Sequence, residues 1–123
     1  MKAAEFVGTL FLARDVAHSV HLNVKGIGSY AKHVALNEFY DNIVELADKF
    51  AEAYQGRHGL IGPIMLMSAK KTGGIVEFIK GSLKDIEDAR YEVCDKNDTA
   101  MQNIIDEIVG QYLSTLYKLE NLQ

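Results

Sequence analysis

The sequence predicts an all-α fold, a four-helix bundle with a long crossover between its second and third helices. Apolar residues recur at spacings of three and four along four segments, which is the pattern of amphipathic helices. The 123 residues contain a single proline, Pro63. Glycine-containing stretches separate the first three segments, and "DKND" turns the chain between the last two. We therefore expect one domain over residues 1–123, with helices over 3–24, 30–55, 75–94 and 98–121.

The first two helices are predicted to form an antiparallel pair. Gly26 and Gly28 stop the first helix, because glycine readily adopts the left-handed conformation that ends helices. Ser29 is a suitable N-cap for the second helix. The apolar positions of that helix run from Val34 to Ala51, including Leu36, Phe39 and Ile43.

Gly56, Gly59, Gly62 and Pro63 break the chain after the second helix, and we expect a short helix over residues 64–69 in the crossover. Asp98 is the predicted N-cap of the fourth helix, whose core stripe includes Leu113. A crossover of about 18 residues can run from one end of a bundle to the other, as it does in ferritin-like bundles.

Composition excludes several classes of function. A net charge of −4 argues against a protein that coats nucleic acid. Cys94 has no partner cysteine, which favours a reducing, cytoplasmic compartment. No stretch of about 18 uncharged apolar residues occurs, so no membrane span and no membrane partner are expected.

Polar side chains form a stripe about 120° wide along the second predicted helix. Its members are His33, Asn37, Asp41, Glu45, Asp48 and Glu52. Four carboxylates on one face repel one another unless lysines, solvent or a metal ion offset their charge. A solvated acidic face and a metal site both remain open, and His18 and His58 are predicted to be bystanders. No Glu-x-x-His pair occurs, so a metal site would differ from the usual one within a single bundle.

The string "HLNVKGIGSYAKHVALNEFYDNIVELADKFAE" resembles the Dps family, mini-ferritins that protect bacterial DNA from iron and peroxide. The resemblance lies in a shared spacing of His21, Asn23, Lys25, Gly26, Tyr30, His33, Asp48 and Glu52. The C-terminal "NDTAMQNIIDEIVGQYLSTLYKLENL" is also similar to the last helix of that family. Two positions depart from the pattern, since Asn37 replaces an aspartate and Leu22 replaces a tryptophan.

The resemblance implies an iron site shared by two subunits of a homo-oligomer. His21 and His33 would come from one subunit and Asp48 and Glu52 from the other. Asn37 and Asp41 are implied as weak ligands or as hydrogen-bond partners of the ligands. Fe(II) would be oxidised by peroxide or oxygen and stored as Fe(III). Zinc or another divalent metal could take the place of iron at the same site.

The assembly would be a dimer at minimum and at most a twelve-subunit shell, in the cytoplasm of a bacterial cell. DNA binding is not expected, because the chain is acidic and begins close to its first helix. Two alternatives remain. One is a helical interaction or assembly protein, virus-encoded, that has kept the fold and lost the chemistry. The other is a bundle that binds zinc or haem between subunits.

Overall fold

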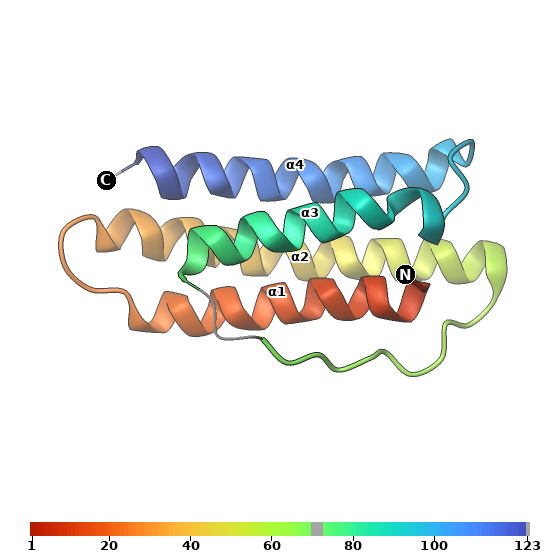
Figure 1. Ribbon diagram of the computed structural model, residues 1–123, viewed down its shortest axis with the longest axis horizontal. Helices are drawn as coiled ribbons and strands as arrows, with labels where there is room; N and C mark the ends of the chain where they lie inside the picture. The colour runs from red at the N-terminus through yellow and green to blue at the C-terminus, as the bar shows by residue number, and fades with distance from the viewer. Residues whose placement is uncertain (70–72, 123) are drawn as a thin grey trace.

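The protein is a bundle of four helices in a computed structural model that describes residues 1–69 and 73–122. The described residues contain no strand, which confirms the all-α prediction. The helices, whose ends lie within three residues of the predicted ones, are α1 Ala3–Asn23, α2 Ser29–His58, α3 Ile75–Val93 and α4 Thr99–Asn121 (Figure 1).

Each helix has two neighbours in the bundle. Helix α1 packs against α2 and α3, and α4 packs against the same two helices. Helices α1 and α4 run in one direction, and α2 and α3 run in the other (Figure 1). Every packed pair is therefore antiparallel. One long face of α2 lies between α1 and α4 without a third helix against it.

The core is a continuous cluster of aliphatic and aromatic side chains. Tyr112 is fully buried, lies edge-on to Phe39 at 5.1 Å between ring centroids, and shares a 2.8 Å hydrogen bond with Ser82. Two predicted core positions were wrong, because Val34 is 44% and Leu113 is 53% exposed. Both residues lie on the outward sides of their helices, where no other helix covers them.

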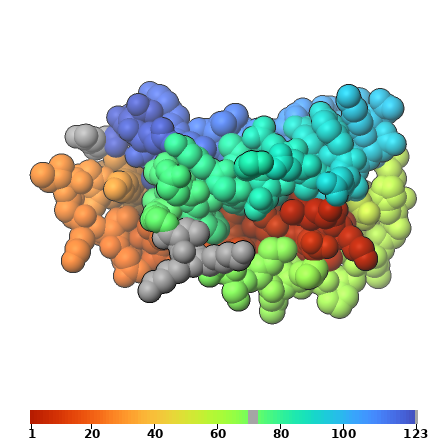
Figure 2. All heavy atoms as spheres, viewed as in Figure 1, coloured from red at the N-terminus to blue at the C-terminus, as the bar shows by residue number. Residues whose placement is uncertain are grey.

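The corner between α1 and α2 is built on two glycines with left-handed backbone. Gly26 has φ of 94° and Gly28 has φ of 81°. Gly28, rather than Ser29, is the residue that precedes α2, and no side chain caps this helix end. Ile27 is held between the two glycines and is 99% exposed. The orange atoms of this corner project from one end of the molecule (Figure 2).

The connection that follows α2 lies along α1. The main-chain carbonyl of Met65 lies so close to Gly8 that a Cβ there would overlap it, and the Thr9 hydroxyl is 3.6 Å from the sulfur of Met67. In the space-filling view, green atoms of this connection lie against the red start of α1 (Figure 2).

The short helix predicted over residues 64–69 is absent, and this segment is extended. The reason is the distance that this segment covers along α1. Helix α1 has 21 residues and is therefore about 31 Å long. Residues 59–69 can reach about 36 Å when extended but only about 16 Å as a helix, and they run along α1 as an extended segment (Figure 1). Within the described part of the chain, no helix is both long enough and apolar enough to cross a membrane.

Candidate functional site

His21 and His33 face each other across the α1–α2 corner. His21 lies near the end of α1 and His33 near the start of α2. Their Nε2 atoms are 3.1 Å apart, and their rings stack with centroids 3.8 Å apart and planes inclined by 28°. The pair that was predicted as nitrogen ligands is therefore brought together within one chain.

Burial keeps His21 uncharged near neutral pH. The residue is only 7% exposed. Desolvation lowers its pKa, the nearby His33 and His18 lower that pKa further, and the Asp41 carboxylate acts in the opposite direction. An uncharged imidazole keeps a lone pair, which a metal ion requires.

The hydrogen bonds of the pair indicate which nitrogen of each ring carries the proton. Nδ1 of His33 is 3.3 Å from the main-chain oxygen of His21, so this nitrogen is the donor. Nε2 of an uncharged His33 must then accept, and Nε2 of His21 donates to it. Nδ1 of His21 is left as a buried acceptor with no hydrogen-bond partner in the described structure.

His18 and Tyr40 belong to the same cluster, although the sequence did not single them out as site residues. The Tyr40 ring stacks on His18 at 4.2 Å between centroids, and it lies edge-on to His21 at 5.2 Å. His18, which was predicted to be a bystander, contacts the cluster because it lies three residues before His21 on the same side of α1. That spacing was visible in the sequence, but the contact with Tyr40 depends on how two helices pack.

A short relay of hydrogen bonds continues from Tyr40 along α2. The Tyr40 hydroxyl donates to Oδ1 of Asn37 over 2.6 Å. The Asn37 amide donates to Oδ2 of Asp41 over 3.2 Å. Asn37 and Asp41, predicted as weak ligands or as partners of ligands, are thus bonded to each other and to the aromatic cluster.

Asp48 and Glu52 lie far from the histidine pair of their own chain. Both carboxylates are exposed on α2. At 1.5 Å per residue, Asp48 is about 22 Å along the helix from His33. Accordingly, residues 1–69 and 73–122 hold no cluster of three or more His, Cys, Asp or Glu side chains that could bind a metal.

The histidine pair fits a metal ion in part. Two imidazole nitrogens 3.1 Å apart, each about 2.05 Å from one ion, would subtend an angle of about 98°. That value lies between the octahedral and tetrahedral angles. The stacked rings direct their Nε2 atoms side by side, and Nε2 of His21 carries the proton. A shared ion therefore requires one ring to swing outward and that proton to move to Nδ1 of His21. His33 can do so because it is exposed.

Carboxylates without ion pairs continue along the outward face of α2. Asp41, Glu45, Asp48 and Glu52 are all exposed. No salt bridge to them is found in the described structure, whereas Glu38, which points elsewhere, pairs with Lys118 at 2.8 Å. The exposed Lys25 and Lys32 lie at the opposite end, near the corner. Lys49 and Arg57 also lie on α2, but they pair with Glu107 and Asp98. Among the remaining charges, opposite signs are thus separated along the corner and α2.

Comparison with known proteins corrects the resemblance suggested by the sequence. The chain is 31% identical over 118 residues to "Uncharacterized 14.6 kDa protein in mobD-ri intergenic region" of Enterobacteria phage T4. That alignment covers 96% of this chain and 88% of the phage protein. No solved structure matches.

A family model described as "Family of unknown function (DUF5856)" matches residues 21–119. The Dps assignment was therefore wrong. The contact between His21 and His33 does not depend on that assignment, because a tight corner between antiparallel helices brings residues at equal distances from its centre together. The chain belongs to the family of unknown function DUF5856.

Proposed function

We propose that this protein binds a divalent transition-metal ion, Fe(II) in the first place, through His21 and His33. The observation that carries the proposal is the 3.1 Å separation of the two Nε2 atoms at a position where His21 is buried with a lowered pKa. Imidazole is a common ligand of iron and zinc. Zinc is the alternative ion at the same two nitrogens.

A second copy of the chain supplies the oxygen ligands in this proposal. The pair alone offers two ligands, and Asp48 and Glu52 cannot reach it within one chain. If two copies pack their α2 helices antiparallel about an axis near Asp41, the start of one helix lies beside the carboxylates of the other. The separation of charge supports this arrangement, because Lys32 of each copy then approaches the acidic half of its neighbour.

Oxidation of bound Fe(II) is the reaction that such a site could support. Two Fe(II) ions and one hydrogen peroxide, with two waters, would give two FeOOH and four protons. Carboxylates favour the Fe(III) product, so Asp48 and Glu52 of the second copy are the residues expected to matter for turnover. Asn37 brings no charge to the site, and its amide is already bonded to Asp41.

Anaerobic titration of the metal-free protein with Fe(II) in a calorimeter tests the proposal. We expect saturable binding that His33→Ala and Glu52→Ala each weaken at least tenfold. His58→Ala and Asp88→Ala are matched controls, because these exposed residues lie outside the site. Addition of peroxide to the loaded protein then shows whether Fe(II) is oxidised. Absence of saturable binding in the parent protein would refute the proposal.

Mixing the two variants tests whether the site is shared between copies. In a mixed dimer of His33→Ala with Glu52→Ala, one of the two sites is complete. It takes its histidines from the Glu52→Ala copy and its carboxylates from the His33→Ala copy. After random exchange of subunits, about a quarter of all sites should bind again. No recovery would refute a site that is shared between two copies.

A helical interaction protein is the second candidate function. Leu22, Ile27 and Tyr30 at the corner are 70%, 99% and 80% exposed, and exposed apolar side chains so close together are typical of contact surfaces. In this case a defined partner would bind the His33→Ala variant as well as the parent, and Ile27→Asp would abolish its binding.

A further inference from the structure

We infer that Tyr40 is the positioning residue of the histidine pair, fixing the ring orientation of His21. This inference concerns the site of the proposed function. It stands on the contacts of one side chain with His18, His21 and Asn37, which come from two helices.

The ring of Tyr40 limits how the histidines of α1 can turn. Its face covers His18, with ring planes inclined by 17°. It meets His21 nearly at a right angle, with planes inclined by 74°. Stacked and edge-on contacts are the two favoured geometries of aromatic pairs. A rotation of the His21 ring about its χ angles would break the edge-on contact and the Nε2 contact with His33 together.

Positioning matters here because few hydrogen bonds fix the buried ring. Nδ1 of His21 has no hydrogen-bond partner in the described structure, so this atom does not determine which nitrogen is protonated. Ligand histidines in proteins usually have their second nitrogen bonded to an outer residue that fixes the ring. At His21 an aromatic wall takes that place.

The hydroxyl of Tyr40 holds the ring itself in place. It donates to Oδ1 of Asn37 one turn earlier on α2, and Asn37 is in turn held by Asp41. The hydroxyl therefore acts on Tyr40, and the ring acts on His21. Loss of the hydroxyl should have a smaller effect on the pair than loss of the ring.

Two variants of Tyr40 and one matched control test the inference. Tyr40→Phe keeps the ring, and Tyr40→Leu removes it. Tyr54→Leu is the control, because Tyr54 is also a half-buried tyrosine of α2 that packs on a histidine, His58, at 4.5 Å. Two measurements are made on each protein. One is the ¹⁵N NMR spectrum of the metal-free imidazoles, and the other is a titration with Co(II) followed by its visible absorption.

The expected result separates positioning from packing. In the parent and Tyr54→Leu, the ¹⁵N shifts should show His21 protonated on Nε2. Tyr40→Leu should release the ring, so that the Nε2 contact with His33 is weakened and the two neutral forms mix. Co(II) binding at Nε2 must move the proton to Nδ1 in every variant, so the loss of ring orientation should raise the Co(II) dissociation constant at least tenfold, within the range found for outer residues of metal sites. Tyr40→Phe should keep the ¹⁵N shifts of the parent, and its Co(II) dissociation constant should lie within about twofold of the parent value.

The two proposals fail in different ways. A parent protein that shows no saturable Co(II) absorption overturns the proposed function, and the Tyr40 inference is then decided by the NMR spectra alone. Unchanged His21 shifts in Tyr40→Leu overturn the inference, whatever the parent binds. Equal changes in Tyr40→Leu and Tyr54→Leu also overturn it, because the effect would then come from general loss of packing.

Discussion

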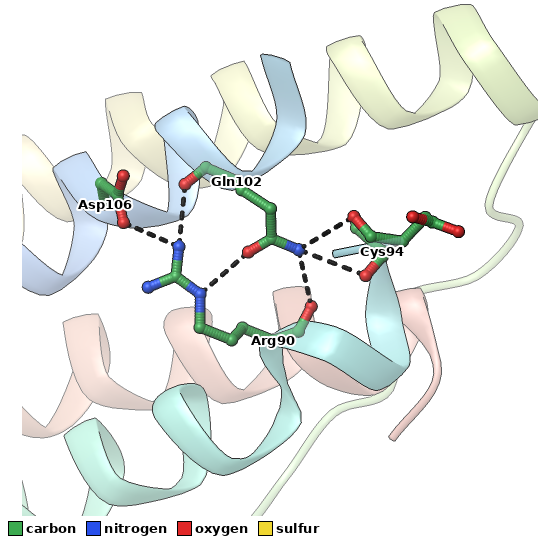
Figure 3. A network of polar contacts seen from close by, with 5 residues as sticks. Arg90, Cys94, Gln102 and Asp106 are labelled. Atoms are coloured by element: carbon green, nitrogen blue, oxygen red, sulfur yellow. Dashed lines mark hydrogen bonds and ion pairs between the residues drawn. The ribbon is translucent and has the colours of Figure 1, made fainter. Parts of the chain in front are cut away.

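Arg90 of α3 and Gln102 of α4 bind each other reciprocally. Nε of Arg90 donates to Oε1 of Gln102 over 2.8 Å, and Nε2 of Gln102 donates back to the main-chain oxygen of Arg90 over 3.1 Å (Figure 3). The same amide lies within 3.2 Å of the carbonyl of Cys94. The Gln102 amide thus supplies a donor to the Cys94 carbonyl, which the end of α3 leaves without a helical partner. The Arg90 carbonyl also accepts from the Cys94 amide, so for that atom Gln102 is a second donor.

Replacing Gln102 with Leu should destabilise the fold. Gln102 is 7% exposed, so its loss leaves the buried carbonyl of Cys94 without the donor that it has in the parent. A buried unsatisfied polar group costs about 1–3 kcal/mol, and we expect a loss of about 2 kcal/mol in the free energy of unfolding. Urea denaturation measures it. Asn103→Leu, at the exposed neighbouring position, should change the same quantity by less than about 0.5 kcal/mol.

Replacing Gly8 with Ala should also destabilise the protein, although alanine is the better helix former. A Cβ at this position overlaps the carbonyl of Met65, so the connection must move away from α1. Strain of this kind costs about 1–3 kcal/mol. The matched variant is Gly110→Ala on α4, where a Cβ meets nothing within 4 Å and stability should rise by about 0.5–1 kcal/mol. A gain of stability in both variants would contradict the close approach.

The features that the sequence predicted correctly depend on interactions between residues close together in the chain. The helices and the α1–α2 corner depend on local signals, such as Gly26 and Gly28, and these signals were sufficient. Asp98 caps α4 as expected, since its carboxylate accepts from the Met101 amide over 3.3 Å.

Long-range packing decided the features that the sequence did not predict. The extended connection depends on a contact with α1, 57 residues away between Gly8 and Met65. Tyr40 contacts His18 only because α1 and α2 pack side by side at that point of the bundle. His21 and His33 contact each other across the corner. Their role as ligands, and their relation to Asp48 and Glu52 of a second chain, stay predictions.

Stability should fall as the pH decreases from 7 to 5, and His21 should account for part of the slope. Its pKa is lowered in the folded protein, so the unfolded chain binds the proton more readily in this range. The contribution is fully present above the unfolded pKa of about 6.5 and is lost as the pH falls toward the folded value. Urea denaturation at several pH values measures the slope.

His21→Gln should flatten this pH dependence, and the exposed His58→Gln should leave it unchanged. If His21→Gln keeps the full slope, other groups cause it, and burial of His21 has no energetic consequence. The same comparison at 1 M salt removes most long-range charge effects, because the Debye length is then about 3 Å. The His21 contribution should survive, since desolvation is its main cause.

Cys94 should be nearly unreactive in the folded protein. It is 3% exposed at the end of α3, and burial raises the pKa of its thiol to about 11. The thiolate is the reactive form, so at pH 8 its population is about a hundredfold lower than for a thiol of pKa 9. Reaction with Ellman's reagent should therefore be at least that much slower in buffer than in 8 M urea.

Gln102→Leu should speed the reaction in buffer, because the Gln102 amide holds the carbonyl of Cys94. A fast reaction in the native parent protein would show that the end of α3 opens readily, and that the Arg90–Gln102 contact does not hold it closed.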